Sequence, residues 1–292
     1  MKALAEEDPI LKGTYWVQDA GACSGVYILE EGRTLIDAGN MYGLADEIRE
    51  LGPLDRIERI LLTHSHFDHV GGVEELYQIV APEIYVHPFS REYLRLLREP
   101  FPRFFDAMET EHKIKYLQDG DSIPDMPHLK AIHTPGHTAG DLCFFDESTG
   151  ALFSGDAVLP QKERLSCILS KPDEVCGGRM EDKVNSLKKL LRLPVRHLFP
   201  GHGQPVFNKG LDQIKISLNA LYRSLYEMEP QKAWISMGNA LLDAGMLEEA
   251  LQCVAKATEI EQDYREAKEL YTKIMAAGKA SEAAEQVELD EI

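Results

Sequence analysis

Residues 60–72 of this chain read ILLTHSHFDHVGG. Three imidazoles and one carboxylate, from His64, His66, Asp68 and His69, fall within six consecutive positions after a short apolar run. Buried histidine and aspartate side chains need hydrogen-bond partners, and four of them side by side would need many. A divalent cation would satisfy them together, so the stretch predicts a buried strand that ends in a metal site.

Three later segments carry further metal-competent side chains after short apolar runs. They are TPGHTAGD with His137, FSGDAVL with Asp156, and FPGHG with His202. Each of these side chains is flanked by glycine, which lets the backbone turn tightly. With the first cluster they make five histidines and two aspartates, which are too many donors for one tetrahedral cation. The set suits two cations that share a carboxylate.

The spacing inside the first cluster predicts how its donors divide. In an extended segment alternate side chains point the same way, so His64 and His66 can chelate one ion. Asp68 and His69 then turn away from them, toward a second ion.

The four segments, in this order, resemble the H-x-H-x-D-H signature and later ligand segments of the metallo-β-lactamase superfamily. The resemblance covers about residues 12–210. It implies an α/β fold, the αββα sandwich, in which two packed sheets are flanked by helices and the site lies at one edge. It also implies a role for each donor. The first metal would be held by His64, His66 and His137, the second by Asp68, His69 and His202, and Asp156 would bridge them.

Residue patterns predict α/β organisation around these segments. Strands are expected at residues 15–17, 26–29, 34–37, 60–62, 84–86, 129–133, 142–145, 151–153 and 197–199. Helices are expected over residues 44–51 and 73–80. Residues 90–118 break the rhythm, with a helix over 91–98 and then an aromatic, proline-punctuated run. We interpret this region either as a cover for the site or as an excursion that packs on the core.

The chain changes character near residue 212, where strand patterns stop and helix formers dominate. We therefore predict a catalytic domain over residues 1–211 and a helical extension over 212–292 with an acidic tail. Residues 233–262 fit one tetratricopeptide-like repeat. A lone helical pair cannot bury both of its faces, so it is expected to dock on the catalytic domain or on a second subunit, as in a homodimer through these helices. A helical hairpin without a binding role is an equal alternative.

Composition narrows the class of protein. The chain has 292 residues, 44% of them hydrophobic and 27% charged, and we find no bilayer-spanning apolar run and no signal peptide. A net charge of −18 argues against nucleic-acid and membrane partners. Five cysteines without a C-x-x-C motif indicate a reducing cytoplasm. Cys167 and Cys176 are interpreted as ordinary thiols rather than a redox pair, and Cys23 as a small strand residue.

The donor set predicts the chemistry. Two cations about 3.5–4 Å apart can share a water and make hydroxide available near neutral pH. Asp68 is placed to orient that nucleophile, besides serving as a ligand. Zinc is the expected metal, although iron and manganese accept the same donors. The substrate is expected to be a small molecule with an ester-like bond, a thioester or a lactone, because the motifs are most similar to glyoxalase II-like (hydroxyacylglutathione hydrolase-like) and lactonase-like hydrolases.

Three alternatives remain open. A mononuclear-iron persulfide dioxygenase of the same fold would use only His64, His137 and Asp156. A phosphodiesterase or nuclease of this fold is disfavoured by the acidic charge. A scaffold protein with a vestigial site is disfavoured by the complete donor set. A flavodiiron protein is rejected because such proteins carry glutamate at the position of His66.

Overall fold

The computed structural model describes residues 1–17, 24–40, 43–98, 100–161, 167–225 and 228–290. The described chain forms two compact units. The first contains residues 1–187 and 194–213, and the second contains residues 188–193 and the chain from residue 214 onward. Cys23, interpreted from the sequence as a small strand residue, lies outside the described residues.

The first unit is built on two mixed sheets. The larger sheet has its seven strands in chain order: β1 (Lys2–Ala3), β2 (Tyr15–Val17), β3 (Val26–Leu29), β4 (Thr34–Ile36), β5 (Arg59–Leu61), β6 (Glu83–Val86) and β7 (Ile114–Tyr116). The smaller sheet has the order β14 (His197–Pro200), β11 (Ala151–Gly155), β10 (Leu142–Asp146), β9 (Met126–His133) and β8 (Ser122–Ile123). A separate hairpin joins β12 (Leu159–Pro160) to β13 (Cys167–Ile168).

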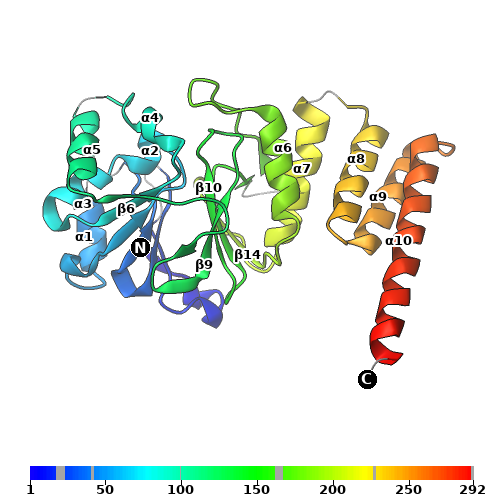
Figure 1. Ribbon diagram of the computed structural model, residues 1–292, viewed down its shortest axis with the longest axis horizontal. Helices are drawn as coiled ribbons and strands as arrows, with labels where there is room; N and C mark the ends of the chain where they lie inside the picture. Colours follow the sequence, from blue (N-terminus) through cyan, green and yellow to red (C-terminus); the bar gives the residue numbers. More distant parts are fainter. Residues whose placement is uncertain (18–23, 41–42, 99, 162–166, 226–227, 291–292) are drawn as a thin grey trace. The chain divides into compact units, whose positions relative to one another are not determined.

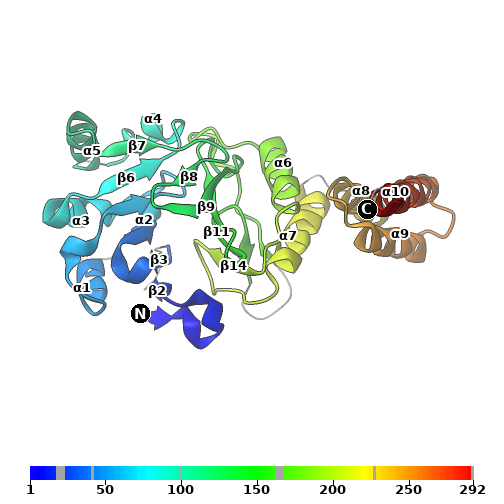
Figure 2. The same ribbon diagram turned by 60° about the horizontal axis from the view of Figure 1, so that its bottom comes forward.

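Helices cover the outer faces of these sheets, as Figures 1 and 2 show. On the larger sheet they are α1 (Leu44–Arg49), α3 (Val73–Val80) and α5 (Phe101–Thr110), with the short α2 (Phe67–Val70) and α4 (Ser90–Leu94) nearby. Helix α6 (Met180–Leu190) lies on the outer side of the smaller sheet. The predicted αββα sandwich is therefore confirmed.

Alternation along the strands divides the core into two layers. Ile28, Leu35 and Ile60 pack with the residues of the outer helices. Tyr27 and Leu61, their neighbours in the chain, point to the opposite face and pack with the smaller sheet. Both faces of these strands are buried, which explains why they read as continuous apolar runs and not as alternating ones.

Strand direction brings the predicted donors to one edge. Strands β4 and β5 are parallel, so the residues that follow them leave the larger sheet together. In the smaller sheet β11 and β14 are parallel, and β9 runs the same way because β10 is antiparallel to both β9 and β11. The donors that follow β5, β9, β11 and β14 therefore all leave the sheets at the carboxyl ends of their strands.

Two glycines let the sheets approach at this edge. A Cβ on Gly155, which has φ +47°, would lie 2.7 Å from Cβ of Thr63. A Cβ on Gly201 would lie 2.6 Å from Oδ1 of Asp156 and 2.7 Å from Cε1 of His69. Larger residues at these positions would push the edge apart, so the glycines around the predicted donors serve close approach as well as turning.

The region over residues 90–118 packs on the core. Helix α4 ends at Leu94, earlier than the predicted residue 98, and the aromatic run that follows forms helix α5. Phe101, Phe105 and Met108 of α5 are buried in the core layer beneath the outer helices. Proline at the first turn of α5 is compatible with a helix start, which the proline-punctuated sequence concealed. Of the two interpretations, the structure supports the excursion that packs on the core.

The second unit is helical. Its helices are the greater part of α7 (Gly210–Leu225), α8 (Pro230–Asp243), α9 (Leu247–Ile260) and α10 (Arg265–Asp290). The close approach of α8 to α9 and α10 depends on Gly238, where a Cβ would lie 2.6 Å from Leu270 and 3.1 Å from Cys253. Across the described residues no helix combines the length and the apolarity needed to cross a lipid bilayer.

Candidate metal centre

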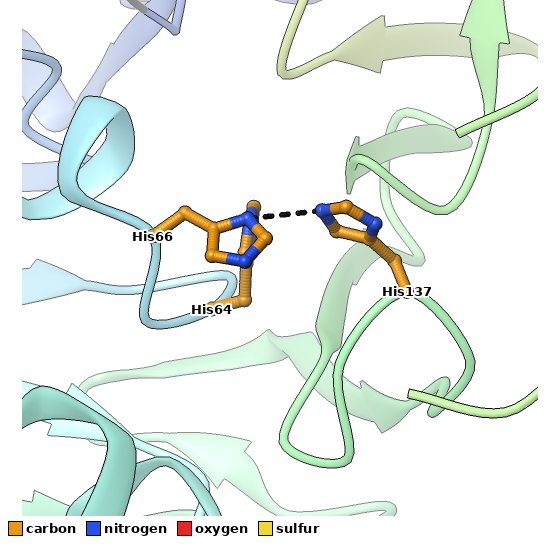
Figure 3. A group of neighbouring side chains, drawn as sticks. All are labelled: His64, His66 and His137. Atoms are coloured by element: carbon orange, nitrogen blue, oxygen red, sulfur yellow. Dashed lines mark hydrogen bonds between the residues drawn. The ribbon is translucent and has the colours of Figure 1, made fainter. Parts of the chain in front are cut away.

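Three histidine nitrogens meet between the two sheets. His64 follows β5, His66 precedes helix α2, and His137 lies in the turn between β9 and β10. Nε2 of His64 lies 3.1 Å from Nδ1 of His66, which lies 3.0 Å from Nε2 of His137. Figure 3 shows His64 and His66 reaching the meeting point from one side and His137 from the other.

Outer hydrogen bonds indicate which ring nitrogens carry protons. Nε2 of His66 donates to the Asp173 carboxylate over 2.9 Å, and Nδ1 of His137 donates to the Lys171 carbonyl over 2.9 Å. The facing nitrogens, Nδ1 of His66 and Nε2 of His137, are then both acceptors. Two acceptors 3.0 Å apart repel each other unless a proton or a metal cation lies between them. The first predicted group is therefore arranged as a set of metal ligands.

A second group forms around helix α2. The helix begins directly after His66 and turns Asp68 and His69 away from the first group, as the spacing predicted. Oδ2 of Asp68 lies 3.0 Å from Nε2 of His202 and 3.8 Å from Nε2 of His69. His69 is fully buried, and His202, after β14, is about one-third exposed. These three side chains form a second potential ligand group.

Asp156 spans the two groups. Its Oδ2 lies 3.6 Å from Nε2 of His137, in the first group. Its Oδ1 lies 3.5 Å from Nε2 of His69 and 3.8 Å from Nε2 of His202, in the second group. One carboxylate thus presents one oxygen to each group, which is the arrangement required of a bridging ligand.

Two orphaned polar atoms support the fit of a metal. Nε2 of His69 and Oδ1 of Asp156 are buried, and neither has a hydrogen-bond partner within the described part of the chain. Leaving such atoms unpaired is costly. A cation between them would satisfy both, and the N/O donors of the two groups are those that zinc, iron and manganese accept.

The titration behaviour differs between the groups. Burial, aided by the charge of His69, lowers the pKa of His64 well below its usual value, and burial also lowers the pKa of His137. In the second group burial opposes charge on His69, yet the carboxylates of Asp37 and Asp156 raise its pKa well above the usual value. The hydrogen bond to Asp68 raises the pKa of His202. Protons therefore compete with a cation mainly at the second group.

Sequence reasoning missed Asp37. This buried carboxylate follows β4 and accepts from Nδ1 of His69 over 2.7 Å, which turns Nε2 of His69 toward the centre. It also accepts from the backbone N–H of Thr63 over 2.8 Å and from its hydroxyl. Such partners fix the tautomer and orientation of a metal-ligating histidine. Its place immediately after a buried strand, like the other donors, was a usable signal.

Two further buried charges lie behind the ligands. Asp141 accepts from the backbone N–H groups of His137 and Thr138, each over 2.8 Å, and so holds the His137 turn. Lys183 of α6 donates to the Ser170 carbonyl over 2.9 Å and lies 3.5 Å from the Asp156 carbonyl. Burial raises the pKa of Asp141 to about 7, and burial lowers the pKa of Lys183. The two charges are linked electrostatically, and neither had a sequence signal.

The remaining histidines and cysteines lie outside the two groups. His87 and His133 stack on each other, with ring centroids 3.8 Å apart and planes 8° apart, and neither belongs to a potential ligand group among the described residues. Neither Cys167 nor Cys176 forms a disulfide with a described residue. Burial raises the pKa of Cys176 to about 11.

Several known proteins resemble this chain in sequence. The sequence profile of the metallo-beta-lactamase superfamily matches residues 19–202. A probable metallo-hydrolase of Bacillus subtilis, YflN, is 28% identical over 204 residues, which cover 60% of this chain and 76% of the relative. The acyl-coenzyme A thioesterase MBLAC2 of Gallus gallus is 26% identical, over 66% of this chain and 79% of the relative.

One solved structure resembles this chain in both sequence and fold. The crystal structure of TTHA1623 in a di-iron-bound form aligns with a TM-score of 0.51 and 27% identity, over 68% of this chain and 96% of that protein. That protein therefore shares the fold of this chain, and its crystal structure holds two iron ions.

Proposed function

This chain belongs to the metallo-beta-lactamase superfamily, and from that premise we propose that it is a dinuclear metal-dependent hydrolase of acyl thioesters. The observation that carries the proposal is Asp156, whose two oxygens face two separate groups of donors. The first ion would be held by His64, His66, His137 and Asp156. The second would be held by Asp68, His69, His202 and Asp156.

The chemistry follows from the groups that the chain provides. A pair of bound divalent cations supplies Lewis acidity and, at neutral pH, a hydroxide nucleophile. Asp68 is partly exposed and lies at the open side of the second group, where its carboxylate can orient the attacking water and accept its proton. Asp37 keeps His69 in the ligating orientation, and Asp173 does the same for His66. No serine or cysteine nucleophile is required.

Two observations support a thioester as the bond that is cleaved. The first is the likeness to an acyl-coenzyme A thioesterase over 66% of the chain. The second is Phe67, which lies in the chain between the ligands His66 and Asp68 and has 47% of its surface exposed. An exposed aromatic side chain adjacent in sequence to two ligands would offer an apolar contact for an acyl group. A lactone is the next candidate, since its ester bond reacts by the same attack.

The second donor group also bears on the single-iron alternative. A persulfide dioxygenase would use only His64, His137 and Asp156, and would leave Asp68, His69 and His202 without a shared role. The orphaned Nε2 of His69 favours a second ion. We propose zinc as the metal, with iron as the alternative because a di-iron-bound relative has the same fold.

A substrate panel tests the proposal. The full chain, with its metal content measured, is assayed against acyl-coenzyme A thioesters, lactones and phosphodiesters, with thiol release followed for the thioesters. We expect turnover of thioesters above that of the other two classes. Turnover confined to phosphodiesters, or oxygen uptake with glutathione persulfide and no hydrolysis, would contradict it.

A further inference from the structure

A loop after the β12–β13 hairpin is tied to two of the metal-centre histidines. Oδ2 of Asp173 lies 2.9 Å from Nε2 of His66, and the backbone N–H of Asp173 donates to the carbonyl of His137 over 2.8 Å. Oδ1 of Asp173 accepts the backbone N–H groups of Val175 and Cys176. The loop is therefore held in place by hydrogen bonds that involve both ends of the Asp173 carboxylate.

The Cys176 thiol completes a third cluster of ligand atoms beside the loop. A ring nitrogen of His66, a carboxylate oxygen of Asp173 and Sγ of Cys176 all lie within 4.8 Å of one another. The cluster uses the ring nitrogen of His66 that faces away from the first inner group. It also differs in chemistry from the two inner groups, because it contains sulfur and they contain only nitrogen and oxygen.

We propose that His66, Asp173 and Cys176 form an outer binding site for a soft divalent cation such as Zn²⁺ or Cd²⁺. One nitrogen, one oxygen and one sulfur donor leave a fourth tetrahedral position for water. Binding forms bonds from the cation to Nε2, to a carboxylate oxygen of Asp173 and to Sγ. The Sγ proton passes to solvent, and the ring proton of His66 is exchanged from Nε2 to Nδ1, so the imidazole stays neutral. No electrons are transferred.

The outer site is open to solvent. The side chains of His66 and Asp173 are 25% and 33% exposed, about as much as His202 and Asp68 of the second inner group at 29% and 31%. A cation that arrives from solvent in excess therefore reaches the outer cluster directly. Because His66 belongs to both sites, an ion on its Nε2 removes the Asp173 hydrogen bond that orients it for the first inner group. Occupancy of the outer site thus weakens the inner one.

Cadmium titration of the metal-free full chain tests this site. Cadmium–thiolate bonds give an ultraviolet charge-transfer band that nitrogen and oxygen ligands do not give. With three equivalents of Cd²⁺ at neutral pH, the unaltered protein should show this band, and Cys176→Ser should lose it while keeping two bound ions. Cys167→Ser, which changes a second partly exposed cysteine of the described chain that forms no disulfide, is the matched control and should keep the band.

Two results would overturn the proposal. One is the absence of the band in the unaltered protein through a tenfold excess of cadmium, and the other is a band of equal strength in Cys176→Ser. Circular dichroism of each variant verifies the fold, and serine is close in size to cysteine. The readout does not depend on hydrolysis, so it is separate from any failure of the proposed thioesterase activity.

Discussion

Oδ1 of Asp156 and Nε2 of His69 lie 3.5 Å apart, and both atoms are buried without a hydrogen-bond partner among the described residues. His69 donates its other ring nitrogen to Asp37, so the nitrogen that faces Asp156 is an acceptor when the ring is neutral. A proton or a cation must lie between the two atoms. We assign that place to a metal ion in the active protein.

Asp156→Asn tests the bridge. Asparagine keeps the shape of the side chain but removes its negative charge and replaces one oxygen with a donor group, so it cannot serve both donor groups. We expect thioester turnover to fall by more than about 100-fold, beyond the range known for residues behind the ligands. Steady-state hydrolysis with saturating metal measures the effect. Turnover within about twofold of the unaltered protein would refute a bridging role.

Asp37→Asn tests the orientation of His69. The substitution weakens the hydrogen bond that fixes the His69 tautomer, and it leaves every proposed ligand in place. Metal affinity or turnover is expected to fall by roughly 10–100-fold, as for other partners of metal-ligating histidines. Asp46→Asn, at a carboxylate that is 78% exposed on α1, is the matched control and should change neither. Equal behaviour of the two variants would argue that Asp37 has no positioning role.

Metal affinity should fall as the pH is lowered. In the metal-free protein the pKa values of His69 and His202 are raised by their carboxylate partners, so these rings retain protons as the pH rises past the usual histidine range. A cation must displace those protons, and the competition strengthens at lower pH. Calorimetric titrations at pH 6 and pH 8 in buffers of different ionisation enthalpy measure both affinity and proton release. An affinity independent of pH would speak against this competition.

Lys183→Met tests the charges behind the ligands. Removing the cation leaves Asp141 as a buried carboxylate without its electrostatic partner, and we expect the free energy of unfolding at pH 8 to fall by roughly 3–5 kcal/mol. Urea unfolding measures it. The double variant Lys183→Met/Asp141→Asn should lose less than the sum of the single changes, because it also removes the stranded charge.

The effect of Lys183→Met should also depend on pH. Burial raises the folded-state pKa of Asp141 to about 7, above its unfolded value, so the folded state favours the protonated carboxyl. The stability that this group contributes is present at low pH and is lost as the pH rises through the folded-state pKa. The penalty of Lys183→Met should therefore be smaller at pH 5 than at pH 8. An equal penalty at both values would mean that Asp141 is not the group left uncompensated.

The donors could be predicted from sequence because each follows a short buried strand and carries its own local pattern, and the sandwich was implied by the resemblance of these segments to the metallo-β-lactamase superfamily. His66 and Asp68 separate between two groups because a helix begins between them, which the spacing also indicated. Asp173 and Lys183 could not be predicted in the same way. They reach the centre from a loop and from α6, which contact it only through tertiary packing.

The aromatic run after residue 99 shows that prolines do not always indicate an irregular segment. Pro102 lies in the first turn of α5, where its missing N–H costs nothing, so a helix forms where the sequence pattern suggested an irregular segment. Only packing reveals that Phe101 and Phe105 belong to the core. Periodicity over so short a stretch does not separate a covering loop from a helix with one buried face.

The metal content of the purified full chain tests the central claim most directly. Elemental analysis after equilibration with zinc, iron or manganese and removal of loosely bound ions should give two ions per chain for the unaltered protein, and fewer than two for Asp156→Asn. A fully active protein that retains a single ion per chain would contradict the assignment of two ions to this centre.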